Sequence, residues 1–382
     1  MFLNLIPREA VNKLQFNAKL KNSTTAEERL AINDAYAEEL FARENYTEAV
    51  KIYKQAFALA GQPNVKAYLT GKIGICHYND GQDKLAVQYL QQSMQLFEPD
   101  ESEFMPDMYG FVLFHLGSLY EYHSKTAQSL EVRKVCEKYV GSQEKDTKWM
   151  LYSGISRNYE ALGKHSEAIS YSQKAIQVLS DDDPGLSYLY ESMANNYMEL
   201  QQYQEAIRHF SRVLELDPRF ERLDEVQAKL ADCYKLISNY AMALETYEKI
   251  LRLKQFTAKS KDFIWIYLKI AECHFRMSAH EKSLLAAMET LHLHPRNPSE
   301  KAEALSFVSA NYYELGRYKE AVADGEKALK LAQRFPNDDI FYVRMALAFH
   351  KLGNRKAFEK YRTLVRRLFE DDNWNRHLEK LS

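Results

Sequence analysis

The sequence predicts an all-α protein, built as an α-solenoid of about nine helix-turn-helix repeats. Helix-breaking residues are scarce, because 13 Gly and 9 Pro among 382 residues amount to about half of the roughly 12% that is usual. A small side chain also recurs at a nearly constant interval along most of the chain. Each interval has room for two short helices, and such a pair can bury its apolar face only against neighbouring copies.

One of the most regular units spans residues 189–218. Its first helix places Ala194 on an apolar face, and a short polar turn follows. The second helix carries Ala206 and Phe210 on one side and ends at Pro218. Because so few residues join the two helices, we expect them to pack antiparallel.

The same pattern returns along the chain. We mark each unit by the small residue that follows its turn, and successive marks are 36 to 43 residues apart: Ala49, Ala86, Ser129, Ala168, Ala206, Ala243, Ser283, Ala321 and Ala357. A second small residue precedes most marks by twelve positions: Ala37, Gly74, Gly117, Ser156, Ala194, Ala231, Ala271 and Ser309. Small residues at both positions let the two helices of a unit approach closely.

The turns and second helices resemble the tetratricopeptide repeat (TPR) family. The sequence Leu-Gly-Arg-Tyr-Lys-Glu-Ala-Val at residues 315–322, with Ala328 further on, is similar to its motif. So is Leu-Gly-Lys-His-Ser-Glu-Ala-Ile at residues 162–169, with Ala175. The resemblance covers about residues 30–370. It implies a right-handed superhelix in which the first helix of each repeat lines a concave groove that binds peptides or helices.

Three features depart from the family pattern. Every spacing exceeds the family period of about 34 residues, which predicts longer helices or longer joints. Arg133 stands where an aromatic residue is usual, and the seventh unit has Ser283 and Ala287 in place of Ala and an aromatic. The groove geometry of standard TPRs therefore cannot be transferred to this chain.

The predicted organisation has three parts: an N-terminal helical cap at residues 1–29, the repeat array at 30–370 and a C-terminal tail at 371–382. Thr24 or Thr25 is the expected N-cap of the first repeat helix, because two Glu residues follow in its first turn. Residues 97–108 and 140–146 are the widest joints, which we expect to be loops. The cap has apolar residues at helical spacing: Leu5, Val11, Leu14, Phe16 and Leu20.

Composition indicates a cytoplasmic protein. The 51 Lys and Arg nearly balance the 53 Asp and Glu, leaving a net charge of −2 and no general attraction to nucleic acid or anionic membranes. The N-terminal apolar stretch is too short for a signal peptide, and no segment approaches the roughly 20 apolar residues of a membrane span. The cysteines are too far apart for a disulfide framework and are expected to be reduced: Cys76, Cys136, Cys233 and Cys273.

The sequence does not predict an enzyme. It contains no phosphate-binding loop, no HExxH zinc motif and no GxSxG nucleophile elbow. His292 and His294 form the densest histidine pair, but no Cys or acid has metal-ligand spacing to them. We expect no cofactor, no metal and no small-molecule substrate.

The candidate site is the predicted inner face of the array. Stepping three or four residues from each buried small residue selects an aromatic surface in the second and third units, followed by polar groups in the next two. Exposed aromatic clusters often mark binding surfaces, and Arg157 and Asn195 are suited to a partner's carboxylate and backbone. The candidate partner-binding residues are Tyr68, Tyr78, Phe111, Phe114, Tyr122, Arg157, Tyr188 and Asn195.

The leading hypothesis is a non-enzymatic scaffold that binds a protein or peptide segment in this groove. A second hypothesis is a bacterial signalling regulator that senses a short secreted peptide. Chain length, the helical N-terminal extension and the long repeats are similar to those of Rap-type response-regulator phosphatases, but no active-site residue can be carried over. RNA binding is a third, weaker alternative, against which the balanced charge argues.

Overall fold

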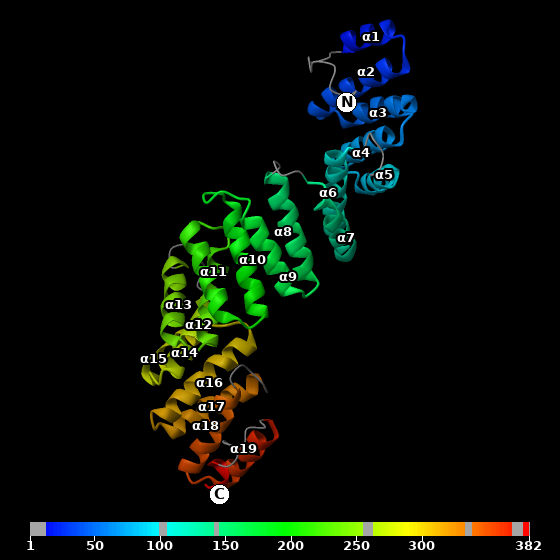
Figure 1. Cartoon of the computed structure of the whole chain (residues 1–382). Coiled ribbons are helices and arrows are strands. Elements are labelled where there is room, and N and C mark those ends of the chain that lie inside the picture. Colours follow the sequence, from blue (N-terminus) through cyan, green and yellow to red (C-terminus); the bar gives the residue numbers. More distant parts are fainter. Residues whose placement is uncertain are drawn as a thin grey trace. The chain divides into compact units, whose positions relative to one another are not determined.

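A computed structural model describes residues 13–98, 105–140, 145–254, 263–332, 338–368 and 377–381. These residues form helices α1 to α19 and contain no strand, which confirms the predicted all-α class (Figure 1). The chain divides into two compact units, residues 1–200 and 201–382. The first twelve residues of the expected cap fall outside the described residues, as do residues 99–104 and 141–144 of the two widest joints. The ends of these joints are helical, because α6 begins at Pro106 and α8 at Lys145.

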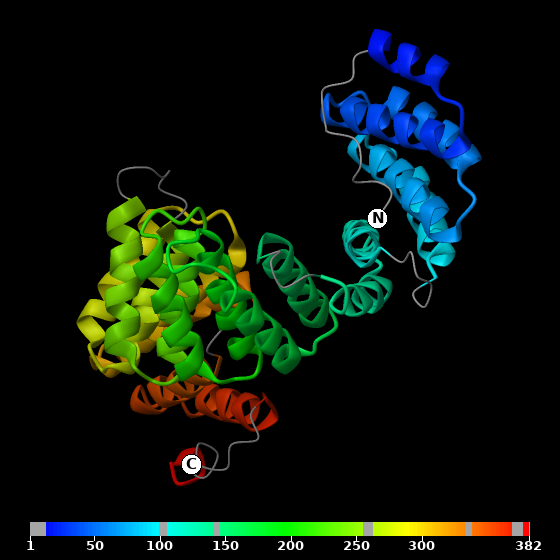
Figure 2. The same ribbon diagram turned by 45° about the horizontal axis from the view of Figure 1, so that its top comes forward.

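The first unit begins with a single helix and continues with antiparallel pairs. In sequence order its helices are α1 (Lys13–Asn22), α2 (Ala26–Ala42), α3 (Tyr46–Leu59), α4 (Pro63–Asn79), α5 (Asp83–Leu96), α6 (Pro106–Tyr122), α7 (Thr126–Cys136), α8 (Lys145–Ala161), α9 (His165–Ile176) and α10 (Gly185–Glu199). Helices α2 to α5 lie side by side in sequence order (Figure 2). The first helices α2, α4, α6 and α8 each have 17 residues, which accounts for part of the long period.

The second unit continues with the same type of helices. They are α11 (Tyr203–Leu216), α12 (Leu223–Leu236), α13 (Tyr240–Lys254), α14 (Ile264–Arg276), α15 (His280–His292), α16 (Pro298–Glu314), α17 (Tyr318–Leu331), α18 (Asp338–Lys351) and α19 (Arg355–Leu368). Within this unit each helix packs against the next in the chain. First helices of successive repeats also contact each other: α14 packs against α16, and α16 packs against α18.

A three-residue turn with a left-handed central residue links the first and second helix of each repeat. The backbone N–H after that residue donates to a carbonyl five positions earlier, as in the 2.8 Å bond from Gln82 to His77. This is the 6→1 bond of a Schellman motif, which caps the first helix. The central residues are Glu44, Gly81, Ser124, Gly163, Gln201, Ser238, Ser278, Gly316 and Gly353.

The small residues meet where the sequence predicted close helix contact. A Cβ added to Gly74 would lie 2.9 Å from the Leu90 side chain, so α4 and α5 can pack this closely only with Gly there. Where the small residue is Ser, its hydroxyl donates across the pair. Ser129 bonds the Gly117 carbonyl oxygen at 2.7 Å, and Ser283 bonds that of Ala271 at 2.8 Å.

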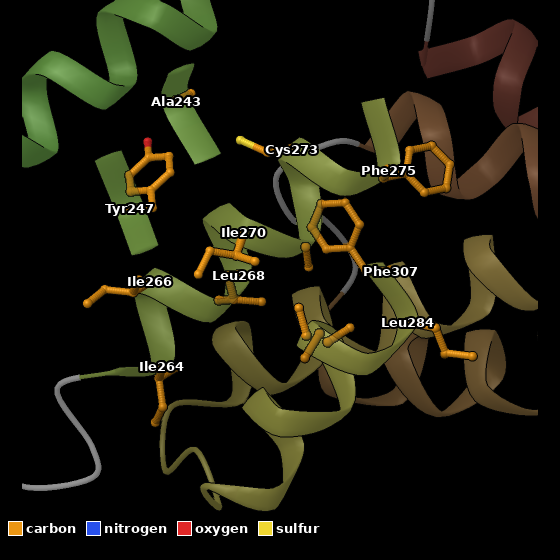
Figure 3. Close-up of a cluster of buried hydrophobic side chains, with 14 of the residues drawn as sticks. Ala243, Tyr247, Ile264, Ile266, Leu268, Ile270, Cys273, Phe275, Leu284 and Phe307 are labelled. Carbon is orange, nitrogen blue, oxygen red and sulfur yellow. The ribbon is translucent and has the colours of Figure 1, made fainter. Parts of the chain in front are cut away.

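The buried side chains form clusters that run between successive repeats. In the second unit, residues from α12 to α16 share one cluster, and Figure 3 shows side chains of α13, α14 and α16 meeting there around Ile270. Another cluster joins α16 to α19 and includes the fully buried Leu378, in the segment expected to be a tail. Each repeat therefore buries its apolar face against its neighbours, as the sequence predicted.

The start of the array also agrees with the sequence. Thr25 is the N-cap of α2, and its hydroxyl accepts from the Glu28 N–H at 3.1 Å in a complete capping box. Helix α1 covers α2 through Phe16, whose ring stacks on Tyr36 with centroids 4.2 Å apart. Leu14, expected on the apolar side, is exposed.

Candidate functional site

The candidate site lies on the first helices of the first unit. Helix α4 packs against α6, and α6 against α8, so residues on the same side of these helices form one continuous surface. We call the solvent side of α2, α4, α6, α8 and α10 the first-helix face. The eight candidate residues are on α4, α6, α8 and α10, and Tyr122 is the last residue of α6.

A polar cluster occupies the α2–α4 end of this face. The Glu38 carboxylate accepts the Tyr53 hydroxyl at 2.5 Å and the Tyr68 hydroxyl at 3.4 Å, and it pairs with Lys72 Nζ at 2.7 Å. Lys72 also lies over the Tyr68 ring, 5.6 Å from its centroid. Tyr68 is therefore partly buried and held by its neighbours.

Asp34 lies beneath this cluster, with 8% of its surface exposed. Burial, followed by the nearby Glu38 carboxylate, raises the pKa of Asp34 to about 7. Its Oδ1 atom has no hydrogen-bond partner among the described residues. Because desolvation disfavours the charged form, Asp34 is a neutral acid over most of the pH range below 7.

An aromatic patch lies next along the face, on α4 and α6. Tyr78 and Phe111 are 36% and 41% exposed, and Phe114 is partly buried. The structure brings these three candidate residues together around His115, whose ring centroid is 5.3 Å from Tyr78, 4.2 Å from Phe111 and 5.6 Å from Phe114. We call Tyr78, Phe111, Phe114 and His115 the aromatic patch.

The sequence prediction missed His115, although it lies one helical turn after Phe111. Its Nδ1–H donates to the Phe111 carbonyl oxygen at 2.9 Å, since a carbonyl can only accept. Burial lowers the pKa of His115. The imidazole is therefore neutral at pH 7 and fills the space between the three rings as a fourth aromatic group.

Tyr122 does not join the patch. It is the last residue of α6, is 77% exposed and contacts the His123 ring. A step of four residues from Gly117 leads to Glu121, and Tyr122 lies one residue further along α6. One residue turns a helix by about 100°, so Glu121 takes the place that the sequence assigned to Tyr122.

Glu121 on α6 forms ion pairs with Arg133 on α7 and with Arg157 on α8. Its Oε2 is 2.6 Å from Arg133 Nη2, and its Oε1 accepts from Arg157 Nε at 2.7 Å. Burial acts to raise the pKa of Glu121, but hydrogen bonds and charges from Arg157 and Arg133 lower it below its ordinary value. The Arg157 guanidinium, a candidate ligand for a partner's carboxylate, is thus already paired with a carboxylate of its own chain.

Arg133 is buried, with only 2% of its surface exposed. Glycines on both sides make room for it, because a Cβ at Gly117 or Gly154 would lie within 3 Å of its side chain. Arg133 Nε and Nη1 have no hydrogen-bond partner among the described residues. With Arg157 and Glu121 it leaves one net positive charge beside the aromatic patch.

Tyr188 and Asn195 lie seven residues apart on α10, which places them on the same side of that helix. Tyr188 is 45% exposed and Asn195 is partly buried. They are polar groups on the first helix that follows α8 in the sequence.

The described residues show neither a metal site nor a reactive thiol. No group of three or more His, Cys, Asp or Glu side chains in the described ranges can hold a metal ion. All four cysteines are buried, and burial raises the pKa of Cys76, Cys233 and Cys273 to about 12. Across the same ranges, no helix is long and apolar enough to cross a membrane.

Comparisons with known proteins agree on the repeat type. Two family models described as tetratricopeptide repeat match the chain, one at residues 146–219 and 186–255 and the other at residues 302–334. No curated protein matches the chain.

Several solved structures are similar. The C-terminal part of a TPR repeat-containing protein from Cytophaga hutchinsonii has a TM-score of 0.50 and 17% identity, with 70% of this chain and 98% of that chain covered. MamA from Desulfovibrio magneticus RS-1 has a TM-score of 0.41 and 20% identity, covering 48% and 94%. PilW, a type IV pilus biogenesis factor, has a TM-score of 0.44 and 14% identity, covering 62% and 99%.

The Cytophaga structure supports the fold alone, because its identity to this chain is low. The family models reach repeats in both units, and the paired helices, left-handed turns and small-residue contacts extend the pattern to the other repeats. The chain therefore contains tetratricopeptide repeats in both of its units.

Proposed function

We propose that the protein is a non-enzymatic scaffold that binds a segment of a partner protein on the first-helix face of its first unit. The aromatic patch carries this proposal. Tyr78 and Phe111 remain substantially exposed although they are large and apolar, and such groups on a soluble surface often anchor a partner. The rings are held by their contacts with His115, so little conformational entropy is lost when they bind.

The polar groups beside the patch fix the orientation of the bound segment. Arg157 is paired with Glu121, yet 56% of its side chain is exposed. It can therefore exchange one of its bonds for a partner's carboxylate or carbonyl. Tyr188 and Asn195 provide further polar groups on α10.

The charges on this face favour a protein partner over nucleic acid. Lys72 is neutralised by Glu38, and Arg133 and Arg157 share Glu121. Binding to a phosphate backbone depends on several uncompensated basic side chains, and this face has only one net positive charge at the arginine cluster.

The double variant Tyr78→Ala with Phe111→Ala tests the proposal. We expect it to weaken binding of the partner recovered from the native host by at least about tenfold, because interface aromatic anchors typically contribute more than 1 kcal/mol each. The affinity of the purified partner is measured by isothermal titration calorimetry, and circular dichroism verifies the helices.

Leu285→Ala with Met288→Ala is the matched control. These side chains are also large, apolar and exposed, but they lie on α15 in the second unit. The control should bind the partner like the wild type. If both double variants bind with wild-type affinity, the aromatic patch is not the binding site.

A further inference from the structure

A cavity of about 360 Å³ lies in the second unit, between the end of α15, the start of α16 and the end of α17. Three leucines and three lysines line it: Leu291, Leu305, Leu331, Lys301, Lys327 and Lys330. Leu305 is buried in the core and Leu331 is 37% exposed. The cavity thus has an apolar floor that reaches solvent between lysine side chains.

Two of the three lysines carry uncompensated charge. Lys327 pairs with Asp324 on its own helix at 2.6 Å. Lys301 and Lys330 are exposed and have no ion-pair partner among the residues that the structure describes. The cavity opening is therefore positively charged.

Two other acidic side chains of the same helices have charged or polar neighbours on other helices. The charged groups near Glu303 on α16 include Lys269 and Glu272 of the first helix α14. Glu326 on α17 acts on Tyr361 of α19. Among the described residues, no ion pair joins Glu303 or Glu326 to Lys301 or Lys330.

We propose that this cavity is a docking site for an acidic peptide segment that inserts one large apolar side chain. Its volume is near the lower end of the roughly 300–1,000 Å³ of ligand pockets, which leaves room for one Leu or Phe side chain. Carboxylates flanking that side chain complement Lys301 and Lys330. The site is separate from the first-helix face and does not depend on the function proposed for it.

A labelled peptide tests this docking site. The probe is fluorescein-Asp-Glu-Asp-Leu-Phe-Glu-Asp-Glu, and its affinity for the full chain is measured by fluorescence anisotropy. We expect Lys301→Glu with Lys330→Glu to weaken binding about tenfold or more, because each reversal replaces an attraction with a repulsion. Leu331→Ser should weaken binding several-fold by removing part of the apolar floor.

Lys319→Glu with Lys356→Glu is the control, since it makes the same change of net charge at exposed sites outside the cavity. This control variant should bind the probe like the wild type. Raised salt should weaken binding of the probe to the wild type and to the control variant. A probe with Ser-Ser in place of Leu-Phe should lose binding.

Several results would overturn the proposal. One is equal affinity of the probe for the Lys301→Glu, Lys330→Glu variant and for its control variant. Another is that the wild type binds a probe with Lys in place of the acids as tightly as it binds the acidic probe. A third is that the wild type binds laurate but not the peptide. A dimer in analytical ultracentrifugation that the same cavity variant dissociates would assign the site to a second copy of the chain instead.

Discussion

Arg133 is a charged residue at a position that large side chains fill in other repeats. The equivalent residues include Tyr53, Phe210 and Tyr247, which are fully buried. The guanidinium is tolerated because glycines flank it and Glu121 pairs with it at 2.6 Å. A buried charge without its partner would be costly, so the arginine and the glutamate depend on each other.

The pH dependence of stability should reveal the buried carboxyl of Asp34. Its pKa is raised from 3.8 to about 7 by burial and by Glu38. The folded state therefore holds a proton that the unfolded chain releases near pH 4. The stabilisation from this proton is complete below pH 4, falls as pH rises from 4 to 7, and is lost above 7.

The variant Asp34→Asn cannot release this proton. We expect its free energy of unfolding, relative to the wild type, to rise between pH 5 and pH 8 by on the order of 1–3 kcal/mol. Urea unfolding at each pH measures this difference and cancels the contributions of other titrating groups. A difference that stays constant across this range would show that Asp34 ionises normally.

The turns inside the repeats carry backbone strain that differs between repeats. Four of the central residues are glycines, but Ser124 and Ser278 have φ of 58° and 59°. Side chains in the left-handed region cost roughly 1–2 kcal/mol, and glycine avoids this cost.

Ser124→Gly should therefore stabilise the protein. The gain expected is about 0.5–1 kcal/mol, because relief of strain is partly offset by the greater entropy of glycine in the unfolded chain. Ser170→Gly is the matched control, at an exposed position inside α9, and should destabilise by about 0.5 kcal/mol. Thermal unfolding of both variants measures the two shifts, and shifts of the same sign would rule out strain at Ser124.

At the level of helices, the sequence predicted which residues pack between helices better than it predicted which residues lie on the exposed face. The spacing of Ala37 and Ala49 predicted a buried helix pair, and both residues are fully buried. Buried positions recur in every repeat, so an error at one is corrected by the others. The exposed end of α6 has no such constraint, and there the expected residue was Tyr122 whereas Glu121 lies on the face.

At the level of the whole molecule, the repeat identifies the fold but not the contacts between side chains of different repeats. Lys72 reaches Glu38 from another helix, and His115 meets Tyr78 in the same way. These pairs are 34 and 37 residues apart, about one repeat, but one is an ion pair and the other a contact between two rings. The aromatic character of the face was visible in the sequence, while its centre at His115 required the structure.

Because each repeat contacts only its neighbours, damage to one repeat should remain local. Gly74→Ala would place a methyl group 2.9 Å from Leu90 Cγ and 3.1 Å from its backbone nitrogen. Overpacking of this kind costs about 1–3 kcal/mol. We expect faster hydrogen exchange in α2 to α7 and unchanged exchange in α14 to α19.

Gly61→Ala is the control for this prediction, because a Cβ there would meet no atom within 4 Å. It should leave exchange unchanged throughout the chain. Hydrogen exchange followed by mass spectrometry resolves each helix. If Gly74→Ala accelerated exchange equally in both units, the chain would unfold as a single cooperative body, and the stabilising contacts would have to extend well beyond neighbouring repeats.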